Sequence, residues 1–530
     1  MSLSGTDSRP ASAQAVPGVA RSRPYIGRRR QFKRSRNGCL TCRSRRKKCN
    51  EEKPRCIGCR RNYLECNWPV EQNHRTSSPS SPRQQDPGQS DLALHSQDAL
   101  TSPSTEIVSR SAEAESPMKE SLWTISFGSF THLTRSCTLT PESPLLLQHY
   151  LTTTATMLPM PANENSFITE IIPAASVDDL LMHSVLVVSG AHMNFEDDSD
   201  GATQKATLCH YSSLIRLLRV EFSELQASDI RKLVRLLLIL VILCHFEAIS
   251  GVNGEALFRH LRASREIILK ILKHQESTPL AHDLTTHFGL GLELYSYLVV
   301  TNCLTPYGLL TERTFPLDHF VTSLDSLSQY QTFGIMFAGL HGLFELIPQA
   351  SLLFGQRLTE QEAGVDEPSS SCVQLHNTIQ SRLQDWNVSQ ATAHNLYDKD
   401  SMTHVSEALR HSIKIYLIAA MQGSSISCPE TISQFQSHVD IVFSSGGKLH
   451  QSQWTATLMW PFLIAGSCAT QQDHQQLLSH TLRHSRYRMK HSIRAANLLQ
   501  KLWDDPDPQM YGPYGLYLAI SQHDVTFGTL

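Results

Sequence analysis

Apolar residues recur at three- and four-residue steps from about residue 140 to the end of the chain. This spacing places them on one face of an α-helix. Alternating apolar and polar residues, which would indicate strands, are scarce. We therefore predict an all-α domain over residues 141–530. Its clearest helical segments are 145–157, 180–193, 203–226, 255–272, 280–300, 333–353, 401–421 and 479–502.

Local signals predict where three of these helices begin. Ser143 is followed by a proline, which suits an N-cap with proline at the first helical position. Ser176 and Asp179 have the spacing of a capping box. Ser228 and Asp229 open a further helix whose centre is apolar on all sides.

That apolar centre is Leu236–Cys244. It holds nine residues, whereas a bilayer needs about 20. We therefore predict a buried core helix rather than a membrane span.

The stretch before the helical region is too polar to build a core. Between His74 and Met118 there are 11 Ser and 5 Pro in 45 residues. Such composition is typical of a disordered linker, which we place at 70–140. Val70–Ala112 shows no heptad repeat, so we expect no coiled coil there.

Charge divides the chain unevenly. Residues 21–61 hold 17 Lys/Arg and 2 Asp/Glu, whereas the rest holds 30 Lys/Arg and 47 Asp/Glu. A short basic arm on an acidic body favours a nucleic-acid partner over a membrane, because the arm lacks an apolar face. Residues 1–36 are predicted to be a disordered basic arm, with no apolar segment typical of a signal peptide.

Six cysteines follow this arm at the spacing C-x2-C-x6-C-x6-C-x2-C-x6-C. They are Cys39, Cys42, Cys49, Cys56, Cys59 and Cys66. A C-x2-C pair brings two thiolates to one metal, and zinc takes four such ligands in a tetrahedron. Two zinc ions need eight ligand places, so one sulfur from each half would bridge both. The internal repeat makes Cys39 and Cys56 the symmetric choices.

The alternative for these cysteines is a disulfide framework, which needs an oxidising compartment. The seven other cysteines are scattered without paired spacing and are predicted to be reduced core residues.

This cysteine stretch resembles the fungal zinc binuclear cluster DNA-binding domain. The match covers the six cysteines, the basic run Arg43–Lys48, Pro54, and the closing residues 66–69. The resemblance implies a cis peptide before Pro54. It also implies two ligand sets that share two sulfurs, Cys39, Cys42, Cys49 and Cys56 for one zinc and Cys56, Cys59, Cys66 and Cys39 for the other.

The basic run Arg43–Lys48 is predicted to form a short helix that enters the major groove of DNA. The resemblance puts base contacts at Arg45 and Arg46 and phosphate contacts at Arg43 and Lys48. Lysine is the commonest residue of that family at the position of Arg46. Arginine can bind guanine bidentately, so a CGG-like half-site is expected.

The helical region resembles a second family, the fungal-specific regulatory domains found downstream of such clusters. The resemblance rests on residues 145–150, 178–192 and 460–466. It implies regulation through a ligand or partner and restraint of activation, against the alternative of a plain helical scaffold.

Enzyme motifs are weak. Gly289 and Gly291 lack the third glycine and the strand of a dinucleotide-binding loop. His480 and His484 lie one helical turn apart but among basic residues, which favours a solvated face over a metal site. No enzyme is predicted.

Two acidic segments, Glu196–Asp200 and Asp504–Phe527, are candidate activation surfaces. The first could equally be a loop between helices, and the second could simply dock on the helical body.

Together these observations predict a small zinc-stabilised binuclear cluster domain at 37–69, a linker, and a large all-α regulatory domain. The expected function is a nuclear, sequence-specific transcription regulator of RNA polymerase II type that binds two zinc ions and double-stranded DNA. A second copy, contacted through the helical domain, and the transcription machinery are further expected partners, and a membrane is not. The alternative is a zinc-structured protein-interaction adaptor without sequence-specific DNA readout.

Overall fold

A computed structural model describes most of the chain. The described residues are 38–44, 47–54, 56–57, 59, 66–68, 140–158, 165–195, 201–226, 228–251, 254–387, 399–426, 428–449, 454, 457–523 and 528. They fall into two compact units, Met1–Ser116 and Pro117–Leu530, which are treated separately below. The first contains the cysteine stretch and the second the helical body.

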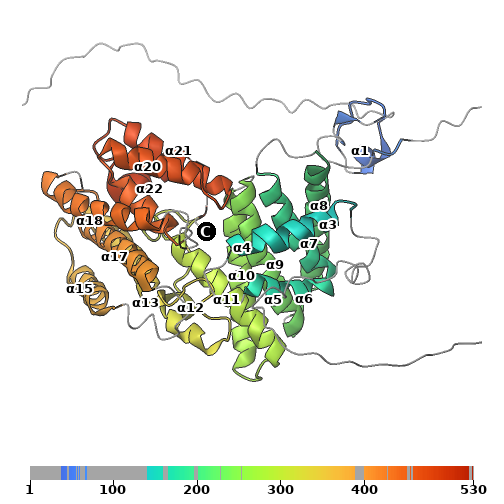
Figure 1. Cartoon of the computed structure of the whole chain (residues 1–530), viewed down its shortest axis with the longest axis horizontal. Helices are drawn as coiled ribbons and strands as arrows, with labels where there is room; N and C mark the ends of the chain where they lie inside the picture. The colour runs from blue at the N-terminus through green and yellow to red at the C-terminus, as the bar shows by residue number, and fades with distance from the viewer. Residues whose placement is uncertain are drawn as a thin grey trace, which may run out of the picture. The chain divides into compact units, whose positions relative to one another are not determined.

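Every regular element in the described residues is a helix, which confirms the all-α prediction for the second unit. A first group of helices lies at the right of Figure 1, in cyan and green. Its members are α3 (Ser143–His149), η2 (Tyr150–Thr154), α4 (Ala155–Met157), α5 (Ser166–Thr169), α6 (Ile171–Ser176), α7 (Asp179–Met193), α8 (Gly201–Ser223), α9 (Ile230–Ser250), α10 (Gly254–Gln275) and α11 (His282–Thr301). Within it α7 packs on α3, α8 and α9, and α9 packs on α10 and α11.

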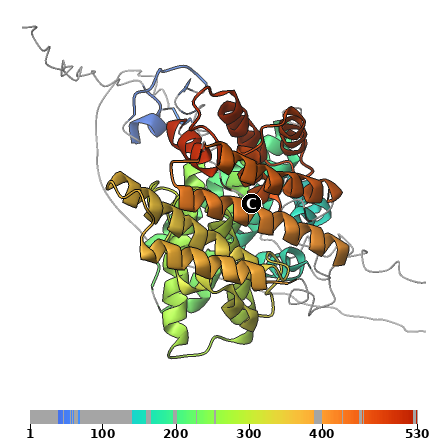
Figure 2. The same cartoon turned by 90° about the vertical axis from the view of Figure 1, so that its left-hand side faces the viewer.

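A second group lies at the left of Figure 1, in yellow to red, and faces the viewer in Figure 2. Its members are α12 (His319–Thr322), η3 (Leu324–Gln329), α13 (His341–Phe344), α14 (Leu346–Glu362), α15 (Ser370–Asp385), α17 (Lys399–Gln422), α18 (Pro429–Lys448), α19 (Met459–Ser467), α20 (Gln472–Arg483), α21 (Lys490–Asp504) and α22 (Gly512–Gln522). Helix α17 is its centre and packs on α14, α18 and α19. One hydrophobic core runs through both groups.

Helix α9 is the core helix expected around Leu236–Cys244. The whole helix has 21 residues around that nine-residue centre, and by length and composition alone it is long and apolar enough to cross a membrane. In the fold, 89% of its most apolar window is buried against other helices. Burial rather than length therefore identifies it as a core helix.

Gly289 and Gly291 lie inside α11 and serve packing. A Cβ at Gly291 would come within 2.9 Å of Leu237 of α9, and one at Gly289 within 2.5 Å of Tyr330. The two glycines let neighbours approach the α11 backbone, and neither belongs to a loop.

Two of the three predicted helix starts were wrong in detail. Ser143 lies inside α3, whose N-cap is Glu142. Ser176 ends α6 and its hydroxyl donates to the Pro173 carbonyl, so no capping box forms. Asp178 caps α7 instead by accepting from Leu181 N–H at 2.9 Å.

The third start is confirmed, because Asp229 accepts from Lys232 N–H at 3.1 Å at the beginning of α9.

The helices predicted at 333–353 and 479–502 are each interrupted. Residues 331–339 form turns that end before α13, because buried Glu293 accepts the N–H groups of Gly334, Met336 and Phe337. Residues 484–489 separate α20 from α21, with Arg488 at a φ of 48°. Apolar spacing continued across both breaks, so it could not reveal them.

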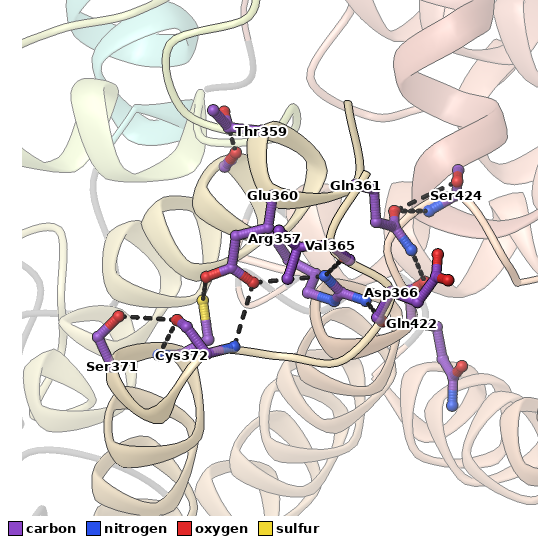
Figure 3. Close-up of polar contacts among 12 residues, drawn as sticks. Arg357, Thr359, Glu360, Gln361, Val365, Asp366, Ser371, Cys372, Gln422 and Ser424 are labelled. Carbon is purple, nitrogen blue, oxygen red and sulfur yellow. Dashed lines mark hydrogen bonds and ion pairs between the residues drawn. The ribbon is translucent and has the colours of Figure 1, made fainter. Parts of the chain in front are cut away.

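A buried arginine fixes the corner between α14 and α15 (Figure 3). Arg357 donates to the carbonyls of Val365 and Asp366 and pairs with Glu360. The thiol of Cys372 donates to the other carboxylate oxygen of Glu360 at 3.2 Å. Burial raises the pKa of this thiol. Cys372 is thus a buried free thiol, as predicted, and so are Cys244 and Cys468. The prediction was wrong for Cys209, which is exposed, whereas Cys303 and Cys428 are half-buried and Cys137 lies outside the described residues.

Candidate metal centre and nucleic-acid interface

The six cysteines of the first unit converge around a short helix, α1 (Leu40–Ser44). Their sulfur atoms form two sets of four, and within each set all sulfurs lie within 4.8 Å of one another. One set is Cys39, Cys42, Cys49 and Cys56, and the other is Cys39, Cys56, Cys59 and Cys66. Both sets contain the sulfurs of Cys39 and Cys56.

The spacing of these sulfurs suits zinc. Sulfurs about 2.3 Å from a central zinc, at the corners of a tetrahedron, lie about 3.8 Å from one another. The observed distances are 3.7 Å for Cys39–Cys56, 3.5 Å for Cys42–Cys56 and 3.6 Å for Cys39–Cys59. Soft sulfur donors at this separation fit Zn²⁺, and four of them around one centre complete its coordination.

Backbone hydrogen bonds repeat between the two halves of the cluster. In the first half, Cys42 N–H donates to the Cys39 sulfur at 3.3 Å and Cys39 N–H to the Cys49 sulfur at 3.5 Å. The second half repeats both contacts, from Cys59 N–H to Cys56 and from Cys56 N–H to Cys66, each at 3.3 Å. The repeat in the sequence is therefore a repeat in structure.

Electrostatics alone do not make all these sulfurs anionic. Burial raises the pKa of Cys42 to about 12 and also raises those of Cys39 and Cys59. Burial would likewise raise the pKa of Cys56, but hydrogen bonds from Cys59 N–H and neighbouring thiols lower it to about 6. A bound cation would supply the charge that stabilises the remaining thiolates.

The ends of the cluster are closed by backbone and side-chain contacts. Leu40 N–H donates to the Asn67 carbonyl at 2.7 Å, and the Trp68 indole donates to the Pro54 carbonyl at 2.8 Å. The peptide before Pro54 is cis, as the resemblance implied. Asn50 accepts from Ile57 N–H at 2.7 Å and so ties the connecting loop to the second half.

Sequence reasoning missed this role of Asn50. The side chain is exposed, and the cysteine spacing gives no signal of this contact.

The predicted DNA-contacting residues are only partly described. Arg43 and Lys48 are exposed. Arg45 and Arg46, the predicted base readers, lie outside the described residues. Helix α1 begins at Leu40, earlier than predicted, and Lys47 and Lys48 follow it in irregular backbone. The prediction of one helix over the whole basic run was therefore wrong at its C-terminal end.

The rings of His480 and His484 stack at 4.4 Å, and both side chains are exposed, which suits the solvated face that the sequence favoured. Within the described part of the chain, the two cysteine sets are the only groups of three or more candidate ligands.

The acidic tail docks, in part, on the helical body. Helix α22 buries Leu516 and Ile520, and the Tyr511 hydroxyl donates to the Cys468 carbonyl at 3.1 Å. This favours docking over an activation surface for residues 504–523. The other acidic segment, Glu196–Asp200, lies outside the described residues.

A six-cysteine zinc cluster followed by a large all-α body defines the class of the fungal zinc-cluster regulators. Residues 145–513 match the fungal specific transcription factor domain, and residues 37–75 match the fungal Zn(2)-Cys(6) binuclear cluster domain. The chain belongs to the family of fungal specific transcription factor domain proteins. Together the two domains are those of a zinc-binding transcription regulator.

Matches to named relatives cover a small part of each protein. The zinc cluster transcription factor CZF1 of Candida albicans is 60% identical over 37 residues, which is 7% of this chain and 10% of that protein. Transcription factor lfc1 of Flammulina velutipes is 42% identical over 52 residues, which is 10% of this chain and 18% of that protein. No solved structure matches the chain significantly.

Proposed function

We propose that this protein is a nuclear, sequence-specific transcription regulator of RNA polymerase II type. The observation that carries the proposal is the pair of four-sulfur sets that share Cys39 and Cys56. Two zinc ions bound in these sets would hold α1 and the basic residues around it in one orientation. The family to which the chain belongs, and the names of the relatives that share its cluster, support the same function.

The ligands are Cys39, Cys42, Cys49, Cys56, Cys59 and Cys66, with the first and fourth bridging the ions. The zinc ions would neutralise the charge of the thiolates and stabilise the fold. The side chains of the protein would recognise the DNA sequence. Arg45 and Arg46 contact base edges of a CGG-like half-site, and Arg43 and Lys48 contact phosphates. The exposure of Arg43 and Lys48 supports their part in this assignment.

The helical body, in turn, receives regulatory signals and provides contacts to a second copy and to the transcription machinery. The domain boundaries that accompany this proposal are 1–36, 37–69, 70–140 and 141–530.

Binding to a randomised pool of DNA sites tests the proposal with the full-length, zinc-loaded protein. We expect Arg46→Ala to lose preference among half-sites, because a bidentate base contact contributes about 1–3 kcal/mol of discrimination. Lys48→Ala should weaken all sites alike, since phosphates carry no sequence information.

Metal analysis of the same protein should give two zinc ions per chain. Unselective binding by the zinc-loaded wild type would overturn the DNA-reading proposal in favour of a protein-interaction adaptor. A single zinc ion would overturn the shared-sulfur ligation.

A further inference from the structure

A groove on the helical body lies between the C-terminal halves of α18 and α20, above α19. It encloses about 270 Å³. Phe443 and Phe462 form one wall with their rings stacked at 6.2 Å. Leu477 of α20 also lines the groove and is 48% exposed, so its apolar side chain is accessible beside this wall. We call this the α18–α20 groove.

Two consecutive glycines keep the groove open. A Cβ at Gly446 would come within 2.5 Å of the Phe462 ring, so only glycine fits beneath that ring. A Cβ at Gly447 would meet nothing within 4 Å. At these two positions no side chain of α18 enters the groove, and the space at Gly447 is available to another molecule.

Basic side chains lie at one end of the groove. Lys448 lies at the end of α18, and His480 and Arg483 lie in the last turn of α20, all three exposed.

The other end of the groove has the opposite sign. His474 stacks on Phe443 at 4.4 Å and lies 4.0 Å from the exposed Asp440 of α18. Exposed Asp473 begins α20 nearby. An elongated occupant would therefore be oriented by its charge, with its acidic part over the Lys448 and Arg483 end.

We propose that the α18–α20 groove is a docking site for an acidic amphipathic peptide segment of a partner protein. Leucine or aromatic side chains of the segment would contact the aromatic wall and the exposed leucine, and its carboxylates would pair with the basic rim. Amphipathic segments dock in this way through apolar anchors spaced along one helical face.

The chemistry of the groove selects this occupant over two others. DNA would gain from the basic rim but would leave the apolar wall and Leu477 uncovered. A second copy would present the same concave groove, which could not fill this one. An acidic, leucine-rich segment would cover the apolar wall with its leucines and pair its carboxylates with the basic end of the groove.

The test is fluorescence anisotropy with full-length, zinc-loaded protein and a labelled synthetic peptide. The peptide carries Leu and Phe at helical spacing and Asp and Glu elsewhere. Two further peptides serve as comparisons: one has the same residues scrambled, and the other carries Lys in place of every acid. We expect the acidic amphipathic peptide alone to bind, and more tightly at low salt.

Two variants locate the site. Gly447→Leu would place a side chain in the groove where space exists, and the double variant Lys448→Glu with Arg483→Glu would reverse the rim. Each should weaken peptide binding on the order of tenfold. Matched controls on α8 are Gly201→Leu, also without neighbours within 4 Å, and Lys205→Glu, also exposed. Neither control should alter binding.

Equal binding by all variants, or preference for the Lys peptide, would overturn the proposal. So would absence of peptide binding accompanied by self-association that Gly447→Leu abolishes, because the occupant would then be a second copy. DNA binding measured on the same variants should be unchanged, and its outcome is independent of the groove.

Discussion

Glu293 is a buried carboxylate that holds a segment of backbone in place. It is 1% exposed and accepts three N–H groups from residues 334–337. Burial raises its pKa to about 7, although these hydrogen bonds act in the opposite direction. Near neutral pH the side chain therefore changes charge inside the core.

Two substitutions at Glu293 should have different effects on stability. Glu293→Ala leaves three buried donors without their acceptor and should lower the free energy of unfolding by about 2–4 kcal/mol. Glu293→Gln keeps one acceptor oxygen and removes the buried charge, so its loss should be smaller and should shrink as pH rises from about 4.5 to about 7. Urea unfolding at pH 5 and pH 8 measures both, and equal losses at both pH values in both variants would contradict this role.

Pairs of histidines join helices in three places. His183 and His210 approach at 2.8 Å between α7 and α8, and His411 and His438 at 3.1 Å between α17 and α18. The third pair is His149 and His192, at 3.2 Å between α3 and α7. In each pair one ring must donate and the other accept, so the rings cannot both be protonated and keep the bond.

These pairs predict that the helical body loses stability in acid. Burial lowers the pKa values of His192, His210 and His411 to about 4, below the usual 6.5. The stability they contribute is present above pH 6.5 and is lost as pH falls toward 4, since the unfolded chain then binds more protons. Urea unfolding across this range should show the loss.

The matched variants are His210→Gln and His523→Gln. His210→Gln should reduce the loss of unfolding free energy between pH 6.5 and pH 4 by about 1–3 kcal/mol, because it removes a buried titrating ring. The second lies at an exposed position and should leave the curve as in the wild type. An unchanged curve in both would show that other groups cause the acid sensitivity.

At the scale of helices, the two kinds of glycine in the body should respond oppositely to alanine. Gly289→Ala places a Cβ 2.5 Å from Tyr330, whose own Cβ cannot move away, and should destabilise the fold by about 1–3 kcal/mol. Gly447→Ala meets no neighbour and should stabilise it by up to about 1 kcal/mol. Thermal unfolding of both variants measures the signs, and equal signs would contradict the packing described for α11.

The periodic pattern predicted α10, α11 and α17 to within a few residues, because each has a continuous apolar face. It missed α15 and α18, although Thr431, Phe435, Val439 and Val442 of α18 follow helical spacing. The breaks at 331–339 and 484–489 could not be predicted, because the first depends on a carboxylate about 40 residues away in the chain.

The metal site was more predictable than the fold, because cysteine spacing constrains which sulfurs can converge. The two sets sharing Cys39 and Cys56 follow the symmetry of the sequence. The N–H···S bonds and the Asn50 contact depend on backbone torsions and were not foreseeable.

At the scale of the whole molecule, each unit has its own core. The cysteines and Trp68 form one cluster, and the helical body forms another. Chelation of zinc should therefore abolish DNA binding while the helical circular dichroism and the thermal transition of the body stay as they were. A body that unfolds in step with zinc loss would contradict this independence.

The sharing of Cys39 and Cys56 also has a consequence for how such a protein would respond to zinc supply. With two ions, each bridging sulfur belongs to both coordination shells, so departure of one ion alters two of the four ligands of the other. Chains with one zinc ion would then be rare. A shortage of zinc would lower the number of chains with a fully loaded cluster rather than the DNA affinity of each loaded chain. Zinc binding would be cooperative, with an occupancy curve steeper than that of two independent sites.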